Sequence, residues 1–158
     1  MDVSRRQALK TGGGAALLGA LLAAGFFKTE EARAAAAEWN KGAFAGKTMD
    51  ETLKAMGAGS PAQSTSITLT APDIAENGAV VPVTVQSSLP KTEAIAILIE
   101  KNPNTLAASF DLPAGTEPLV GTRVKMGQTS NVYALVKADG KYYTAVKEIK
   151  VTLGGCGG

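Results

Sequence analysis

A chain of 158 residues with 45% hydrophobic content has room for one globular domain and a processed segment. Because it has no histidine and a single cysteine, a His/Cys metal site and a Ser-His-Asp or Cys-His catalytic set within the chain are excluded, and no cofactor is predicted. Residues 1–34 hold five of the 16 basic and three of the 14 acidic residues, so the remainder holds 11 of each and predicts no charged face for nucleic acid or an anionic membrane.

The first 34 residues have the features of a bacterial export signal. The pair Arg5-Arg6 precedes a Gly/Ala-rich apolar stretch over residues 15–27, and Ala32-Arg33-Ala34 is a small-x-small site that suits signal peptidase. Ala8 stands where the twin-arginine pattern usually has phenylalanine. A membrane anchor would need about 20 apolar residues, more than this stretch supplies. We predict a twin-arginine signal peptide cleaved near Ala34, a periplasmic protein, and no stable membrane association after cleavage.

A helical segment and a linker are predicted over residues 35–66. Residues 35–40 are good helix formers, and Thr48 and Glu51 match a capping box, with Thr48 as N-cap and Glu51 at N3. Gly57 is the expected C-cap, and the small polar residues that follow it are typical of a linker. The helix has an apolar stripe that we expect to pack on the following domain, with ligand binding as the alternative: Met49, Leu53 and Met56.

The body of the chain, residues 67–153, reads as a series of strands separated by turn residues such as Asn77-Gly78 and Asp139-Gly140. Strands are predicted over residues 67–70, 79–86, 93–100, 106–112, 122–126, 131–137 and 142–153. Pro82 has no backbone N–H, which places the second of these at a sheet edge or bulge. Short strands without intervening helices favour an all-β fold: an antiparallel, immunoglobulin-like β-sandwich of about seven strands, with a closed barrel as the alternative.

Two of these strands carry more specific expectations. The run over 93–100 is apolar on both faces, so it either lies centrally or meets another chain, and we expect it in the core. In the last strand, one face presents a stripe that we expect to hold the strand on the core as far as the terminal glycines: Ile149, Val151 and Leu153.

The only cysteine, Cys156, stands in the last five residues between two glycine pairs, Gly154-Gly155 and Gly157-Gly158. Glycines supply no side chains to bury a thiol and leave the backbone nearly unrestrained, so residues 154–158 are expected to form a flexible arm that presents Cys156. An unperturbed thiol has a pKa near 8.5, and this chain supplies no base to activate it, although Lys147 and Lys150 lie upstream. We predict that Cys156 is a covalent attachment point on which other proteins act.

The terminal run Gly-Gly-Cys-Gly-Gly, the segment over residues 72–83 and the export signal resemble the SoxY family, the sulfur-carrying subunits of the periplasmic Sox sulfur-oxidation system. The resemblance spans essentially the full chain. It implies a carrier and not an enzyme: a c-type cytochrome complex would conjugate Cys156 to thiosulfate, a metal-dependent hydrolase would release the terminal sulfone group as sulfate, and a dehydrogenase would oxidise the remaining sulfane. The chain would work as a heterodimer with the sandwich protein SoxZ.

Other interpretations of the terminus have less support. Cys156 could cross-link two copies of a structural sandwich in the oxidising periplasm. The final Gly-Gly also resembles ubiquitin-like sulfur carriers, but their chemistry consumes ATP, which the periplasm lacks, and leaves Cys156 unexplained. A hydrolytic enzyme has no supporting set of side chains, because the acidic residues are scattered.

Overall fold

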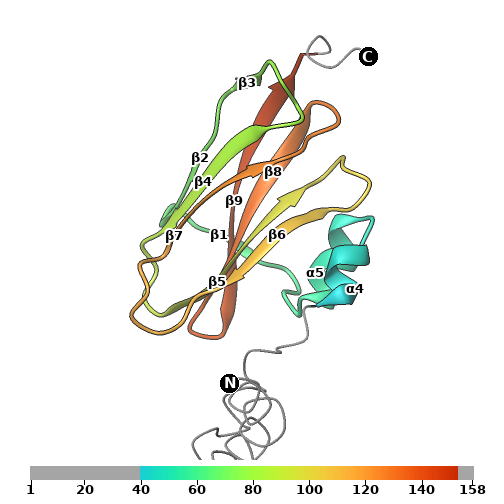
Figure 1. The fold of residues 1–158 in the computed structure, drawn as a ribbon. Helices are drawn as coiled ribbons and strands as arrows, with labels where there is room; N and C mark the ends of the chain where they lie inside the picture. Colours follow the sequence, from blue (N-terminus) through green and yellow to red (C-terminus); the bar gives the residue numbers. More distant parts are fainter. Residues whose placement is uncertain (1–39, 153–158) are drawn as a thin grey trace, which may run out of the picture. The chain divides into compact units, whose positions relative to one another are not determined.

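The computed structural model describes residues 40–152 (Figure 1). The predicted signal peptide over residues 1–34, the helix-forming stretch as far as Trp39, and residues 153–158 with the predicted arm lie outside the described residues. Within residues 40–152, neither helix has the length and apolarity that crossing a bilayer requires.

The described residues form two stacked β-sheets with two short helices on one outer face (Figure 1). The larger sheet has the order β1-β9-β8-β5-β6, and β3 pairs with β9 outside this path. The smaller sheet has the order β2-β4-β7. The strands are β1 (Ala62–Gln63), β2 (Ile67–Thr70), β3 (Ile74–Ala75), β4 (Val81–Ser87), β5 (Thr92–Ile99), β6 (Leu106–Asp111), β7 (Leu119–Val124), β8 (Ser130–Ala138) and β9 (Lys141–Val151).

The all-β sandwich predicted from the sequence is confirmed, and the closed barrel is wrong because the strands belong to two separate sheets. All seven predicted strands are present, but the fifth, expected over residues 122–126, begins earlier, at Leu119, and ends at Val124. Two short strands, β1 and β3, were not predicted. Both run parallel to β9, so the larger sheet is not wholly antiparallel.

Pro82 does not place its strand at a sheet edge, because β4 is the central strand of the smaller sheet. The prediction fails for a local reason. Pairing between β4 and β2 begins only at Thr84, so at Pro82 the strand has just one neighbour, β7, where Pro82 lies opposite Arg123. A residue without an N–H is tolerated where one flank has no partner strand.

The main hydrophobic core fills the space between the two sheets. From the smaller sheet, Val81, Val83 and Val85 alternate inward on β4 and are buried. From the larger sheet, the side chains of β5, β8 and β9 that meet them include Ile95, Ile97, Ile99, Val132, Val136 and Ile149. Burial of the period-two faces of both sheets accounts for the strand pattern read from the sequence.

The opposite face of β5 is covered by the helices α4 (Lys41–Ala45) and α5 (Met49–Ala55), so the expectation that this strand lies in the core is confirmed. Ala96 and Leu98 are buried there in a second hydrophobic cluster. The predicted stripe of α5 packs against that cluster, and so does Phe44 of α4: the α5 residues are Met49, Leu53 and Met56. Tyr142 of β9 donates a hydrogen bond to the Met56 carbonyl at 2.8 Å and ties the helix end to the sheet.

The predicted N-cap of α5 is confirmed, its C-cap is Met56, one residue before the predicted Gly57, and the ends of α4 were missed. The Glu51 N–H donates to Thr48 Oγ1 at 3.2 Å, and the Glu51 carboxylate accepts from the Lys47 N–H at 3.1 Å. Gly57 has φ +69° just past the helix, and the Ala58 N–H donates back to the Leu53 carbonyl, as in a Schellman motif. The five-residue helix α4 is too short to show a sequence period.

Candidate functional site

The predicted site residues, Cys156 and the glycines at 154, 155, 157 and 158, lie outside the described residues. The structure does describe the point from which that segment leaves the sandwich, the end of β9. We call residues 150–152 the root. In Figure 1 the root lies at the same end of the sandwich as β3, the loop that leads into β4, and the loop between β7 and β8.

Three hydrogen bonds donated by backbone N–H groups, two to backbone carbonyls and one to a side-chain hydroxyl, hold the root from both of its edges. On one edge, the Lys150 N–H donates to the Asp73 carbonyl at 3.0 Å and the Thr152 N–H donates to the Ala75 carbonyl at 3.1 Å. On the other edge, the Val151 N–H donates to Thr129 Oγ1 at 3.0 Å. Because every N–H of the root has a partner, the backbone is held up to Thr152.

The loop over residues 76–80 closes against the root. Asn77 accepts a hydrogen bond from the Ala79 N–H at 2.9 Å through its side-chain oxygen, which forms an Asx turn. The Gly78 carbonyl accepts from the Met126 N–H at 2.7 Å, so the loop is tied to the β7–β8 connection as well. A Cβ built on Gly78 would lie 2.8 Å from Val151 Cγ1. The loop therefore needs glycine at this position to approach β9.

The segment over residues 72–83, which carries part of the family resemblance, thus supplies both β3 and the loop that packs on the root. Sequence reasoning identified its Asn77-Gly78 turn but did not place it beside the C-terminal strand. The sequence signals that could have suggested this were the turn residues themselves, together with Ile74, an apolar residue inside a loop.

Lys147 is engaged within the sandwich. Its ammonium forms an ion pair with Asp73 at 2.9 Å and donates to the Ala71 carbonyl. It lies on the same face of β9 as Ile149, the face turned toward the other sheet, and the loop after β2 neutralises its charge. Lys150 is exposed at the root.

The residues that the structure describes offer no second candidate site for metal binding or catalysis. Residues 40–152 contain no cluster of three His, Cys, Asp or Glu residues that could hold a metal ion. Hydrogen bonding between Lys137 and Glu93, at 3.0 Å, lowers the pKa of Glu93 and raises the pKa of Lys137. This pair joins β8 to β5 near the hairpin end of the sandwich, opposite to the root, and serves as a cross-strand ion pair.

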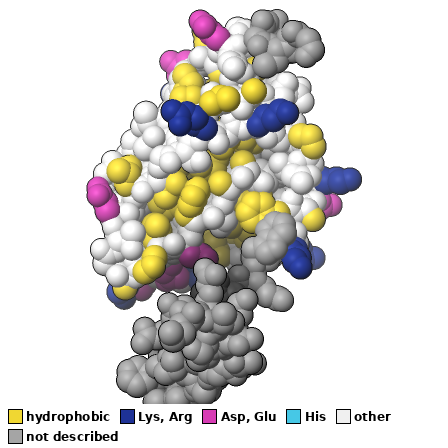
Figure 2. All heavy atoms as spheres, viewed as in Figure 1, with side chains coloured by type: hydrophobic (Ala, Val, Ile, Leu, Met, Phe, Trp, Pro, Cys, Tyr) yellow, Lys and Arg dark blue, Asp and Glu magenta, His cyan; other side chains and the backbone are white. Residues whose placement is uncertain are grey.

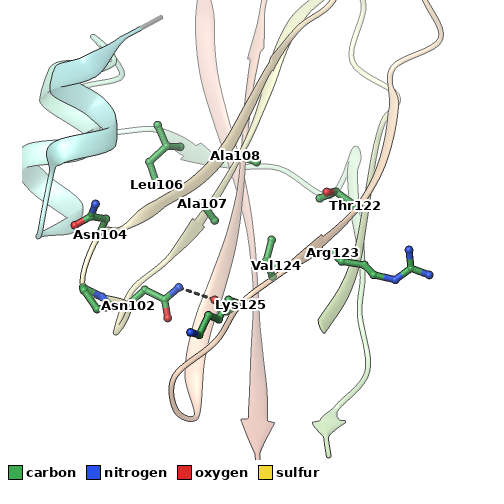
Figure 3. Close-up of a pocket in the computed structure, with 10 residues that line it drawn as sticks. Asn102, Asn104, Leu106, Ala107, Ala108, Thr122, Arg123, Val124 and Lys125 are labelled. Atoms are coloured by element: carbon green, nitrogen blue, oxygen red, sulfur yellow. Dashed lines mark hydrogen bonds between the residues drawn. The ribbon is translucent and has the colours of Figure 1, made fainter. Parts of the chain in front are cut away.

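A groove of about 460 Å³ opens between the edge strands β6 and β7 (Figure 3). Asn102 donates a hydrogen bond to the Lys125 carbonyl at 2.7 Å at one end of it. Arg123 points away from Asn102 and Leu106, and small side chains, Ala107 and Ala108, line much of the wall. The groove therefore presents no converging set of acid, base and nucleophile.

Comparison with known proteins identifies one matching protein family and one solved structure with substantial sequence identity. The family described as "Sulfur oxidation protein SoxY" matches residues 53–156, a range that ends at Cys156. The sulfur carrier protein SoxY from Chlorobium limicola f thiosulfatophilum is 44% identical, with a TM-score of 0.56 over 63% of this chain and 93% of that chain. No curated protein sequence matches the chain.

Similarity to other solved structures concerns the fold alone. A superoxide reductase (neelaredoxin) from Ignicoccus hospitalis is 19% identical, with a TM-score of 0.50 over 55% of this chain and 80% of that chain. At that identity the sandwich is shared, whereas the site is not transferable.

Proposed function

The chain belongs to the SoxY family of sulfur oxidation proteins, and we propose that it is a carrier that holds thiosulfate-derived sulfur covalently on Cys156. The observation that carries the proposal is the extent of the family match, which runs through the sandwich and ends at the only cysteine of the chain. The related protein from Chlorobium limicola f thiosulfatophilum is itself described as a sulfur carrier.

The chemistry requires partner enzymes. Only a few per cent of a thiol with a pKa near 8.5 is ionised at pH 7, and the chain has no histidine that could act as its base. In the first step, the Cys156 thiolate and the sulfane sulfur of thiosulfate form an S–S bond, giving Cys–S–S–SO₃⁻. The two electrons released in this step pass to a c-type cytochrome complex.

Two further enzymes return the carrier to its starting state. In a metal-dependent hydrolase, water attacks the terminal sulfone group, and the bond between that group and the neighbouring sulfur breaks. Sulfate is released, and Cys–S–SH remains on the carrier. A dehydrogenase then accepts six electrons from the outer sulfur, with three water molecules as the source of oxygen, and gives Cys–S–SO₃⁻, on which the same hydrolysis restores the thiol. The held backbone at the root provides a fixed point from which Cys156 is presented to each enzyme in turn.

The remaining parts of the proposal concern location and assembly. Residues 1–34 direct twin-arginine export, with cleavage near Ala34, so the chain functions in the periplasm. It works there as a heterodimer with a SoxZ-like sandwich subunit and docks transiently with the cytochrome, the hydrolase and the dehydrogenase. Support comes from the leader residues and from family membership.

Mass spectrometry of the chain recovered from thiosulfate-oxidising cells tests the carrier proposal. We expect intact masses with sulfur adducts that a reductant removes and that map to the peptide containing Cys156. The Cys156→Ser variant should carry no adduct and lose sulfur oxidation, whereas Gly157→Ser, which places a serine beside the intact thiol, should still carry adducts. A thiol that is always bare, or full activity of Cys156→Ser, would overturn the proposal.

The cross-linked structural sandwich predicts a different result in the same material. If Cys156 only joins two copies of the chain, non-reducing gels should show a stable disulfide homodimer in all active protein, and reduction should halve its mass. A carrier instead runs at the same position on both gels apart from its adducts.

A further inference from the structure

The loop over residues 76–80, which closes against the root, contains the only asparagine of the chain that is followed by glycine, Asn77. The other asparagines precede lysine, proline, threonine and valine. The backbone nitrogen of the next residue can attack an asparagine side-chain amide, and the attack is least hindered when that residue has no Cβ. Asn77 is therefore the asparagine at which the sequence most readily permits this chemistry.

The fold presents the amide carbon of Asn77 as an electrophile. Asn77 is exposed to solvent, and its Oδ1 accepts a hydrogen bond from the Ala79 N–H at 2.9 Å. Attack on the amide carbon moves negative charge onto this same oxygen. A backbone N–H that already points at the oxygen stabilises the charge, as a donor in an oxyanion hole does. The Asx turn that shapes the loop thus also activates the amide.

The nucleophile of the reaction, the Gly78 backbone nitrogen, is not engaged by the fold. Among residues 40–152, no group accepts a hydrogen bond from the Gly78 N–H, whereas the Gly78 carbonyl accepts from the Met126 N–H at 2.7 Å. Gly78 is half-buried between the exposed residues Asn77 and Ala79, so water and hydroxide reach this peptide bond. The structure therefore places an activated amide beside an unpaired backbone N–H.

We propose that Asn77 is a self-modification site, which loses its side-chain amide through a cyclic imide formed with Gly78. The Gly78 nitrogen gives its proton to hydroxide and forms a bond to Asn77 Cγ. The Cγ–Nδ2 bond then breaks, and ammonia leaves with a proton from water. A second water molecule opens the imide ring at one of its two carbonyl carbons, so the reaction consumes one water, releases one ammonia and transfers no electrons.

The site of ring opening decides which of two acids is formed. Cleavage between Asn77 Cγ and the Gly78 nitrogen gives aspartate in a normal backbone. Cleavage between the Asn77 backbone carbonyl carbon and the same nitrogen gives isoaspartate, in which the chain runs through Cβ and Cγ. Either product adds a carboxylate to the root end of the sandwich, where Figure 2 shows acidic side chains at the surface.

The two products differ in their effect on the root. Aspartate leaves the backbone unchanged, and its carboxylate accepts from the Ala79 N–H as the amide did. Isoaspartate inserts one methylene group into the backbone immediately before Gly78. This glycine has no room to move toward β9, because a Cβ built on it would lie 2.8 Å from Val151 Cγ1 and closer still to the Met126 carbonyl oxygen. Isoaspartate therefore loosens the contact between the loop and the root.

Incubation of the purified full chain in buffers of rising alkalinity tests the proposal. Peptide mapping by mass spectrometry measures conversion of each asparagine to the acid, and labelling by protein isoaspartyl methyltransferase measures isoaspartate. Asn77→Ser is the matched control, because a serine hydroxyl can accept the Ala79 N–H but has no amide to lose. Asn77→Asp represents the aspartate product. Gly78 is left unchanged, since a side chain there would itself disturb the packing.

We expect Asn77 to convert before Asn104, which is also exposed but is followed by threonine, at a rate that rises with hydroxide concentration. Chain that contains isoaspartate, separated by chromatography, should unfold about 4–8 °C below unmodified chain, whereas Asn77→Asp and Asn77→Ser should unfold within about 2 °C of it. Asn77→Ser should gain no isoaspartate in the peptide that contains residue 77.

An Asn77 amide that outlasts the amide of Asn104 would show that the fold blocks the reaction and would overturn the proposal. Isoaspartate-containing chain that is as stable as Asn77→Asp would overturn its effect on the root. Neither result depends on Cys156, so the carrier proposal stands or falls by its own test.

Discussion

The loop that contains Gly78 can pack against the root only because this residue has no side chain. Its built Cβ would clash with the Met126 carbonyl oxygen and approach Val151 Cγ1 to 2.8 Å. The Met126 oxygen belongs to the backbone, and Val151 is part of the root, so neither neighbour moves without loosening the contacts that hold β9. The glycine is required here by space, since its φ is not among the positive values of the chain.

We predict that Gly78→Ala lowers the free energy of unfolding by about 1–3 kcal/mol, the usual cost of overpacking a tight contact. Chemical denaturation followed by circular dichroism measures this. Gly127→Ala is the matched control, because a Cβ on Gly127 meets no atom within 4 Å and its φ is not positive. Equal stability of the two variants would show that the loop moves away from the root at little cost.

Among the elements, β5 is unusual because both of its faces are buried by parts of the same chain. Ile95, Ile97 and Ile99 face the smaller sheet, whereas Ala96 and Leu98 face the helices. The helices are only five and seven residues long, too short to be stable alone in water, so their stability derives from this contact. The strand therefore joins the helical segment and the sandwich into one packed structure.

For this reason we predict that Leu98→Ala, which removes a fully buried side chain beneath the helices, costs about 2–5 kcal/mol. The loss should appear as one transition in which the helical and strand signals fall together in urea. Leu119→Ala, at an exposed position, should change stability by less than about 1 kcal/mol. A separate early loss of the helical signal, with the sandwich unaffected, would contradict a shared core.

At the scale of the whole molecule, the proposed heterodimer must be distinguished from transient docking. A stable interface buries about 800 Å² on each partner, whereas a transient contact buries less.

Coexpression of the chain with a SoxZ-like sandwich protein should give a one-to-one complex in native mass spectrometry. A fully active lone monomer would rule out the obligate heterodimer.

Local signals explain why much of this fold could be predicted. The capping box at Thr48 and Glu51 depends on residues three apart, and strand β4 shows period-two burial that its own side chains determine. The predicted covalent site, Cys156, rests on the isolation of one cysteine among glycines at the end of the chain. Each of these features can be recognised without knowing which residues distant in the sequence lie beside it.

By itself, then, the sequence determined the sandwich class, the N-cap of α5 and the candidate thiol, because each follows from residues close together in the chain. Tertiary structure alone decided that β4 is central, that β1 and β3 pair with β9 in parallel, and that Asp73, Ala75 and Thr129 hold the root. Thr129 and Val151 are 22 residues apart, and the partners across β3 are still more distant. Such pairings are selected by the packing of the whole domain against the entropy of closing long loops, which no local pattern records.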